Sequence, residues 1–170
     1  LEEAIAAVDA VPAGGEYASV GGKKVVLFLE AKDGPAQAGL IKFITERGLQ
    51  RRTVIKMYRD GSGGFKPTSR YLKLANSAGC ATWCYFDGGD PIDKISAMAR
   101  HENVDAIGVP YYEKPTGASQ GSMSEENVRA LTGLGKAVIV WEIHRRSAYE
   151  KYKALGVKGF MCPDPYWVIG

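Results

Sequence analysis

Short apolar runs alternate with helix-like segments along almost the whole chain, and this alternation constrains the fold more than any other feature. About six runs have the length and composition of buried strands, and helical segments separate them. The predicted strands are 24–31, 53–58, 81–86, 104–109, 136–141 and 158–162. Strict alternation of this kind predicts a parallel sheet with right-handed crossovers. The fold class is therefore α/β, either an open doubly wound sheet or most of a (β/α)8 barrel.

The predicted helices begin and end at recognised signals. They cover residues 1–8, 35–48, 67–77, 91–101, 124–131 and 146–155. Pro35 lies in a first helical turn, where proline is tolerated, Gly48 ends that helix, and Ser124 is a suitable N-cap. A G-x-G-x-x-G or Walker A pattern is absent from the sequence, which argues against a nucleotide-binding open sheet.

Bulk composition indicates one globular domain and excludes several classes of function. The chain has 170 residues, of which 45% are hydrophobic and 24% charged, and its net charge is +3. The basic residues are scattered, so we expect no nucleic-acid partner. We also expect no transmembrane segment and find no signal peptide, and the localisation cannot be predicted. Cys80, Cys84 and Cys162 lack the dense spacing of a metal or disulfide framework and are interpreted as small apolar side chains.

The stretch 25–34 contains the first candidate site. It starts as a continuous apolar run, typical of a strand buried on both faces, and ends in charged residues. Glu30 and Lys32 are two residues apart, so their side chains point to the same side of a strand. In parallel α/β folds the C-terminal tip of a strand is where ligands bind. The alternative is an ion pair that only closes the end of the strand.

Aromatic residues gather at the other predicted strand ends. They are Tyr58, Trp83, Tyr85, Tyr111, Tyr112 and Trp141. Such side chains suit a pocket for a polyol or a sugar phosphate, but they are equally ordinary core and loop residues. Of the two histidines, His144 follows a predicted strand, whereas His101 ends a helix and is expected at the surface.

Four segments, taken in chain order, resemble the glycerophosphodiester phosphodiesterase family. Residues 29–32, Leu-Glu-Ala-Lys, resemble its (I/L)-E-x-K strand, and residues 1–4 resemble the L-E-E helix start before it. Residues 138–144, Val-Ile-Val-Trp-Glu-Ile-His, resemble its late V-x-V-W-T-V-N strand. Residues 155–165 resemble its closing A-L-G-V-D-G-I-I-T-D-x-P segment. The match spans almost the whole chain.

The resemblance implies a TIM barrel, a metal-dependent hydrolase of lipid metabolism that converts glycerophosphodiesters into an alcohol and glycerol phosphate. It implies that Glu30 is a ligand of a divalent cation, Mg²⁺ or Ca²⁺, and that Lys32 contacts the phosphate. Trp141 would line the substrate pocket, and Tyr111 and Tyr58 are added as substrate-binding candidates. His144 lies where the family usually has asparagine; it is a candidate catalytic residue that cannot simply replace the family's acid and base.

The sequence departs from the family at its beginning. The family's first strand carries H-R-G, its second carries E-x-D, and a second histidine follows; these motifs would lie before Leu1. We therefore expect residues 1–170 to form a single domain, a partial barrel with about six of the eight βα units that lacks the first two strands. An upstream segment or another copy of the chain would complete it.

Three functions stay open. The first is part of a phosphodiesterase, and the alternative is a non-catalytic binding or structural module of the same fold, for example in a cell-surface or virion protein. Another phosphate-handling barrel, such as an isomerase, is disfavoured because the last loop, Pro163-Asp164-Pro165, lacks the glycines that such phosphate sites use. In each case we expect Glu30, Lys32, Asp60, Asp87, Tyr111 and Trp141 at one rim of the sheet.

Overall fold

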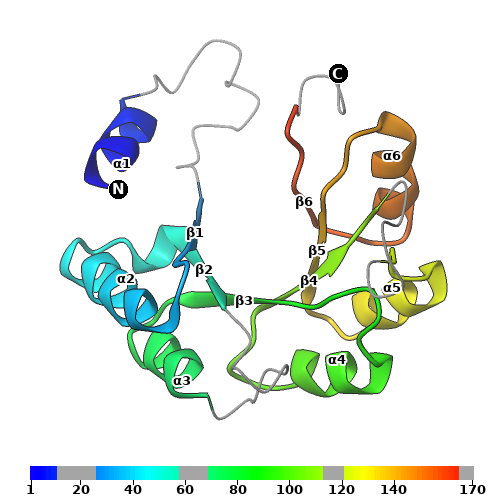
Figure 1. Cartoon of the computed structure of the whole chain (residues 1–170), viewed down its shortest axis with the longest axis horizontal. Helices are drawn as coiled ribbons and strands as arrows, with labels where there is room; N and C mark the ends of the chain where they lie inside the picture. The colour runs from blue at the N-terminus through cyan, green and yellow to red at the C-terminus, as the bar shows by residue number, and fades with distance from the viewer. Residues whose placement is uncertain (11–25, 58–68, 113–120, 165–170) are drawn as a thin grey trace.

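The strands form one parallel sheet that curls into half of a barrel (Figure 1). The computed structural model describes residues 1–10, 26–57, 69–112 and 121–164. Its strands are β1 (Leu27–Glu30), β2 (Thr53–Met57), β3 (Ala81–Tyr85), β4 (Ala106–Pro110), β5 (Ala137–Trp141) and β6 (Gly159–Phe160). Within these residues the strands lie side by side in chain order, β1 to β6, and every neighbouring pair is parallel. The predicted TIM-barrel-like α/β fold with six βα units is confirmed.

The helices that connect the strands cover the outer, convex side of the sheet (Figure 1). They are α2 (Gly34–Glu46), α3 (Arg70–Ser77), α4 (Ile92–Ala99), α5 (Glu125–Thr132) and α6 (Arg146–Ala154), and a short 3-10 turn spans Gln50–Arg52. Side-chain caps fix three helix starts, because Asp33, Ser69 and Ser124 each accept a hydrogen bond from a backbone N–H three residues ahead. No helix among the described residues is long and apolar enough to cross a membrane.

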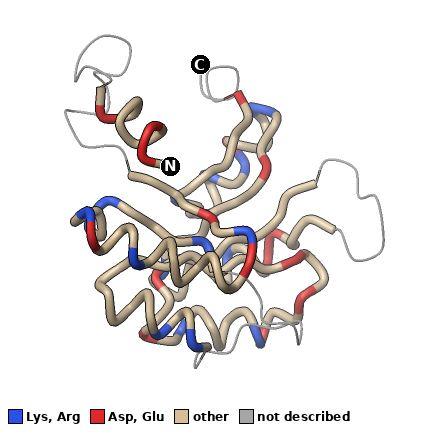
Figure 2. Tube along the Cα trace, turned by 60° about the vertical axis from the view of Figure 1, so that its left-hand side comes forward, with Lys and Arg blue, Asp and Glu red and all other residues tan. Residues whose placement is uncertain are grey.

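The first helix, α1 (Glu2–Asp9), attaches to the rest of the domain through ion pairs. Asp9 accepts a hydrogen bond of 2.6 Å from Arg52, and Glu2 pairs with Arg47. Both arginines belong to the connection between α2 and β2, so this connection holds α1. Acidic and basic residues are interspersed along the described chain, in agreement with the scattered charge of the sequence (Figure 2).

Alternate strand residues divide the interior into two layers. Side chains of one parity point outward and join the helices in a continuous outer core, in which Ile44, Ile55, Cys84, Ile107 and Val140 have no exposed surface. Cys80 is also buried there, so both cysteines are the apolar side chains that we expected. Side chains of the other parity form a smaller inner cluster of Trp83, Ala106 and Ile139, with Val54, Tyr85 and Trp141 packed against it.

The expectation that the first strand is buried on both faces is wrong. Leu27 is buried on the helix side, but the ring of Phe28 is 53% exposed on the inner side, and Val26 is exposed as well. The reason is position in the sheet. Among the described residues β1 pairs with β2 alone, and the ring of Phe28 contacts that of Trp83 in β3, which lies on the same side of β1 as β2. Apolar composition could not distinguish this strand from a fully enclosed one.

Predicted boundaries differ from the observed ones by a few residues. The last strand, for example, is predicted at 158–162 and observed as Gly159–Phe160. Backbone hydrogen bonds to β5 continue on either side of it, from Lys158 to Val138 (3.1 Å) and from Met161 to Val140 (2.9 Å). The segment therefore follows β5 over most of the predicted length.

Candidate functional site

The C-terminal ends of the parallel strands meet at one rim, and inward-facing side chains at this rim form the candidate site. The strand register relates their faces: Glu30 pairs with Lys56, Lys56 with Trp83, and the same parity continues through β4 to Trp141. Glu30 and Trp141 thus lie on the same face of the sheet, as predicted. Tyr58 and Asp60, also expected at this rim, lie outside the described residues.

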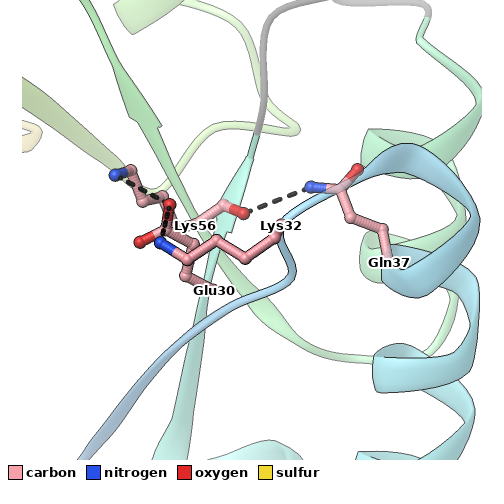
Figure 3. A network of polar contacts seen from close by, with 4 residues as sticks. All are labelled: Glu30, Lys32, Gln37 and Lys56. Atoms are coloured by element: carbon pink, nitrogen blue, oxygen red, sulfur yellow. Dashed lines mark hydrogen bonds and ion pairs between the residues drawn. The ribbon is translucent and has the colours of Figure 1, made fainter.

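A carboxylate held between two lysines occupies the β1–β2 side of the rim (Figure 3). Glu30 Oε1 lies 3.2 Å from Lys32 Nζ and 3.3 Å from Lys56 Nζ. The side chain of Lys32 is 81% exposed, whereas that of Lys56 is only 19% exposed. The contact between Glu30 and Lys32 follows from their spacing, and the second lysine adds a cation that the sequence analysis overlooked.

Several contacts hold Lys56 in place. Its ammonium lies 4.4 Å from the ring centroid of Tyr85 and 5.5 Å from that of Trp83, distances typical of cation–π interactions. Its backbone carbonyl accepts a hydrogen bond of 3.2 Å from the amide of Gln37, a buried side chain on α2 (Figure 3). A signal for Lys56 existed, because it is the one charged residue in the apolar run 53–58 and alternates with buried neighbours.

Aromatic rings surround Trp141 at the middle of the rim. Its indole lies 6.5 Å from the ring of Tyr85 and 5.8 Å from that of Tyr112, both nearly perpendicular. Burial, and then the charges of Asp87 and Glu142, raise the pKa of Tyr112. This phenol therefore stays protonated at neutral pH, and aromatic faces and carboxylates share this side of the rim.

Tyr111 is placed differently from its neighbour. Its ring packs edge-to-face on Tyr152 of α6, with centroids 5.5 Å apart, and it belongs to the outer core. The next residue along the chain has the opposite parity, so Tyr112 reaches Trp141 and Tyr111 does not. The structure thus brings Tyr112 to the rim, a residue that the sequence analysis named only among the strand-end aromatics.

The two histidines lie at opposite ends of the sheet. His144 follows β5 and is 50% exposed, and its Nε2 lies 3.5 Å from Glu142 Oε2. Three strands separate β5 from β1, so His144 and Glu30 lie far apart along the strand order of the sheet. His101 precedes β4, at the N-terminal end of the strands, where its Nδ1 accepts a hydrogen bond from the backbone of Asn103. Only His144 is therefore placed at the candidate site.

The described side chains do not make a site for a divalent cation. Among them no group of three or more His, Cys, Asp and Glu residues is arranged to hold a metal ion. At Glu30 two ammonium groups lie against the same oxygen, and their charge opposes a nearby dication. A hard cation takes six or more oxygen ligands, several of them from protein or water, and Glu30 alone cannot supply such a shell.

Comparisons with known proteins support the fold. No protein-family model and no curated protein matches the chain. A protein of Agrobacterium tumefaciens described as a glycerophosphoryl diester phosphodiesterase is similar in structure, with a TM-score of 0.62 and 16% identity over 86% of this chain and 57% of that one. One from Silicibacter pomeroyi with the same description has a TM-score of 0.57 and 15% identity, over 89% and 51%. The fold is a partial TIM barrel.

A third similar structure extends the likeness to another class of phosphodiester-binding barrel. It is a Bacillus subtilis protein with an EAL domain, solved with its substrate c-di-GMP and calcium, with a TM-score of 0.54 and 12% identity over 86% of this chain and 38% of that one. The chain spans about half the length of the phosphodiesterase structures that it matches. The resemblance predicted from the E-x-K and V-W motifs is confirmed at the level of the fold.

Proposed function

We propose that this chain is part of a phosphodiesterase barrel and that its rim binds the phosphate of a glycerophosphodiester or polyol phosphate. The observation that carries the proposal is the pair of lysines on Glu30, at the strand ends where barrel enzymes bind substrates. Two neighbouring cations can neutralise a phosphoryl oxygen as negative charge develops on it. The structural likeness to glycerophosphoryl diester phosphodiesterases supports the choice of substrate class.

The remaining side chains are assigned by their position on the rim. Lys32, which is exposed, contacts the phosphate, and Trp141 with Tyr112 lines the part of the pocket that holds the glycerol or alcohol. His144 can hold a proton at Nε2 beside Glu142 and is proposed as an accessory proton carrier. Tyr58 stays a candidate from the sequence, and Tyr111 supports the pocket from the outer core.

Completion of the barrel belongs to this proposal. The described residues supply a half-barrel, and the similar phosphodiesterases are about twice as long. We propose that residues 1–170 form one partial-barrel domain, which an upstream segment with the H-R-G and E-x-D motifs, or another copy of the chain, completes. Dependence on Mg²⁺ or Ca²⁺ is proposed for the completed barrel alone, in which Glu30 would be one ligand among several and its replacement by Gln would abolish activity.

The test is hydrolysis of glycerophosphocholine by the 170-residue chain, with Mg²⁺ or Ca²⁺ added. We expect no useful turnover, because phosphodiester cleavage needs one group to generate the nucleophile and another to protonate the leaving alkoxide. Fusion to an upstream H-R-G and E-x-D segment should then produce metal-dependent hydrolysis. Robust turnover by the chain alone, lost in His144→Ala and kept in His101→Ala, would show that the site carries its own acid–base group.

A non-catalytic binding module is the second candidate. It is favoured by the contact of Glu30 with two ammonium groups, which suits the binding of an anion better than the binding of a metal ion. A completed barrel that binds glycerophosphocholine but does not hydrolyse it, with either cation present, would support this candidate.

A further inference from the structure

Lys56 is less exposed than a lysine at the end of a strand usually is, and it contacts a carboxylate and two aromatic rings. Its side chain is largely withdrawn from water, and withdrawing an ammonium is costly unless other groups compensate for its lost hydration. The compensation here comes from the Glu30 carboxylate and from the faces of Tyr85 and Trp83. These contacts fix the ammonium at the rim, on the side that faces the inside of the half-barrel.

Charge around Lys56 is unbalanced in a way that favours an anion. The ammonium groups of Lys32 and Lys56 share one carboxylate oxygen, so this cluster of three described residues has one more cation than anion. Asp33, which follows Lys32 in the chain, uses its carboxylate to cap α2. Asp87 and Glu142 lie toward Tyr112 on the β3–β5 side. A phosphoryl oxygen placed between the two lysines would accept a hydrogen bond from each and balance the charge.

The same arrangement opposes a metal ion. A divalent cation near Glu30 would have to displace both ammonium groups from the carboxylate, and that of Lys56 also lies against the rings of Tyr85 and Trp83. A phosphate ester needs no such displacement, because it would bind both ammonium groups on the side away from the Glu30 carboxylate.

We propose that Lys56, together with Lys32, binds the phosphoryl group directly, so that this rim binds a phosphate ester without a divalent metal ion. The inference rests on the proposed function for the location of the ligand. It differs from that function in two ways. It assigns the binding step to the partly buried Lys56, and it separates binding from any metal that hydrolysis in a completed barrel requires.

The experiment is calorimetric titration of the 170-residue chain with sn-glycerol 3-phosphate, in EDTA and again with Mg²⁺ or Ca²⁺. We expect the same affinity in all three conditions, and no binding of glycerol, which lacks the phosphoryl group. Lys56→Met keeps most of the side-chain stem and removes the charge, and should weaken binding at least about tenfold, as for the loss of one charge-assisted hydrogen bond. Lys32→Met should weaken it by up to about fivefold, because an exposed ion pair contributes less.

Two variants serve as controls. Lys56→Arg keeps the charge with a different geometry and should retain more affinity than Lys56→Met. Lys42→Met removes an exposed lysine of α2 that pairs with Glu46 away from the rim, and should leave the affinity unchanged. The urea midpoint and far-ultraviolet circular dichroism of each variant show that it is folded before its affinity is compared.

Glu30→Gln distinguishes the two kinds of site by the sign of its effect. If lysines bind the phosphate, removing the carboxylate removes a competitor for both ammonium groups, and the affinity for sn-glycerol 3-phosphate should rise. If a metal ion binds it, the variant loses a ligand, and the affinity should fall.

The outcomes separate the inference from the proposed function. Binding that requires Mg²⁺ or Ca²⁺ and falls in Glu30→Gln would overturn the inference and leave the proposed function standing. Metal-free binding that is equal in Lys56→Met and Lys42→Met would overturn the role of Lys56 alone. Absence of binding in every condition would overturn both.

Discussion

The two faces of the sheet differ in how completely they are packed. On the outer face, Ile55, Ile107 and Val140 have no exposed surface and pack against the helices. On the inner face the ring of Phe28 is half exposed, and the indole N–H groups of Trp83 and Trp141 are buried without a hydrogen-bond partner among the described residues. The outer face thus supplies most of the packing that stabilises the domain, whereas the inner face is packed less completely.

This difference explains why chemistry collects on one side only. Inward-facing positions include Glu30, Lys56 and Tyr85, while the outward-facing positions of the same strands carry no charge. They are apolar apart from Thr53 and Thr82, whose buried hydroxyl groups donate hydrogen bonds to backbone carbonyls. A charged residue on the outer face would be buried under a helix and would need a partner there. On the inner face, near the strand ends, it reaches the rim and remains available to a ligand.

The largest expected effect contrasts one apolar residue of each face. Ile107→Ala leaves a cavity in the outer core and should lower the free energy of unfolding by about 2–5 kcal/mol. Phe28→Ala removes a larger side chain but from a half-exposed position, and should cost clearly less. Urea denaturation of the two variants measures the difference. A greater loss for Phe28→Ala would show that the inner face is covered in solution.

A smaller effect is expected at two glycines that lie in differently packed surroundings. A Cβ on Gly108 of β4 would collide with the indole of Trp83, so Gly108→Ala should destabilise the domain by about 1–3 kcal/mol. Gly39, inside α2, has no heavy atom near the position of an added Cβ, and Gly39→Ala should stabilise the domain by about 0.5–1 kcal/mol. Thermal unfolding of both variants tests the pair, and a neutral Gly108→Ala would indicate that Trp83 can move aside.

The sequence predicted the fold well because the fold depends on local patterns. The alternation of apolar runs and helical segments determines a parallel sheet, and the caps Asp33 and Ser124 and the turn at Gly48 follow from residue chemistry within one helical turn. The contact of Glu30 with Lys32 was predictable for the same reason, since residues two apart on a strand share a face.

The parts that were missed depend on contacts between distant segments. Whether Phe28 is covered depends on which strands face β1, and this cannot be read from its own run. Lys56 is the one charge in its apolar run, but only the register shows that it lies beside Glu30 and over Tyr85. Tyr111 and Tyr112 are adjacent tyrosines, and only the end of β4 decides which of them turns inward.

The smallest expected effect is a pH dependence that again separates the faces. Burial, and after it the charges of Tyr111 and Glu125, raise the pKa of Tyr152, on the outer side, from 10.0 to about 12. The unfolded chain releases this proton near the ordinary value, whereas the folded chain retains it. The contribution to stability is therefore complete below pH 10 and is lost as the pH rises toward 12.

Tyr152→Phe removes this dependence and should flatten the fall in urea midpoint between neutral and strongly alkaline pH. Tyr112→Phe is the matched control on the inner side. Its pKa is also raised, by burial, Asp87 and Glu142, but the residue is only half-buried at the rim, so the slope should change less. The two pH profiles are compared with that of the unaltered chain. A larger change of the pH slope in Tyr112→Phe than in Tyr152→Phe would mean that the phenol at the rim is the more deeply buried one. The inner face would then be the better packed of the two at this end of the sheet.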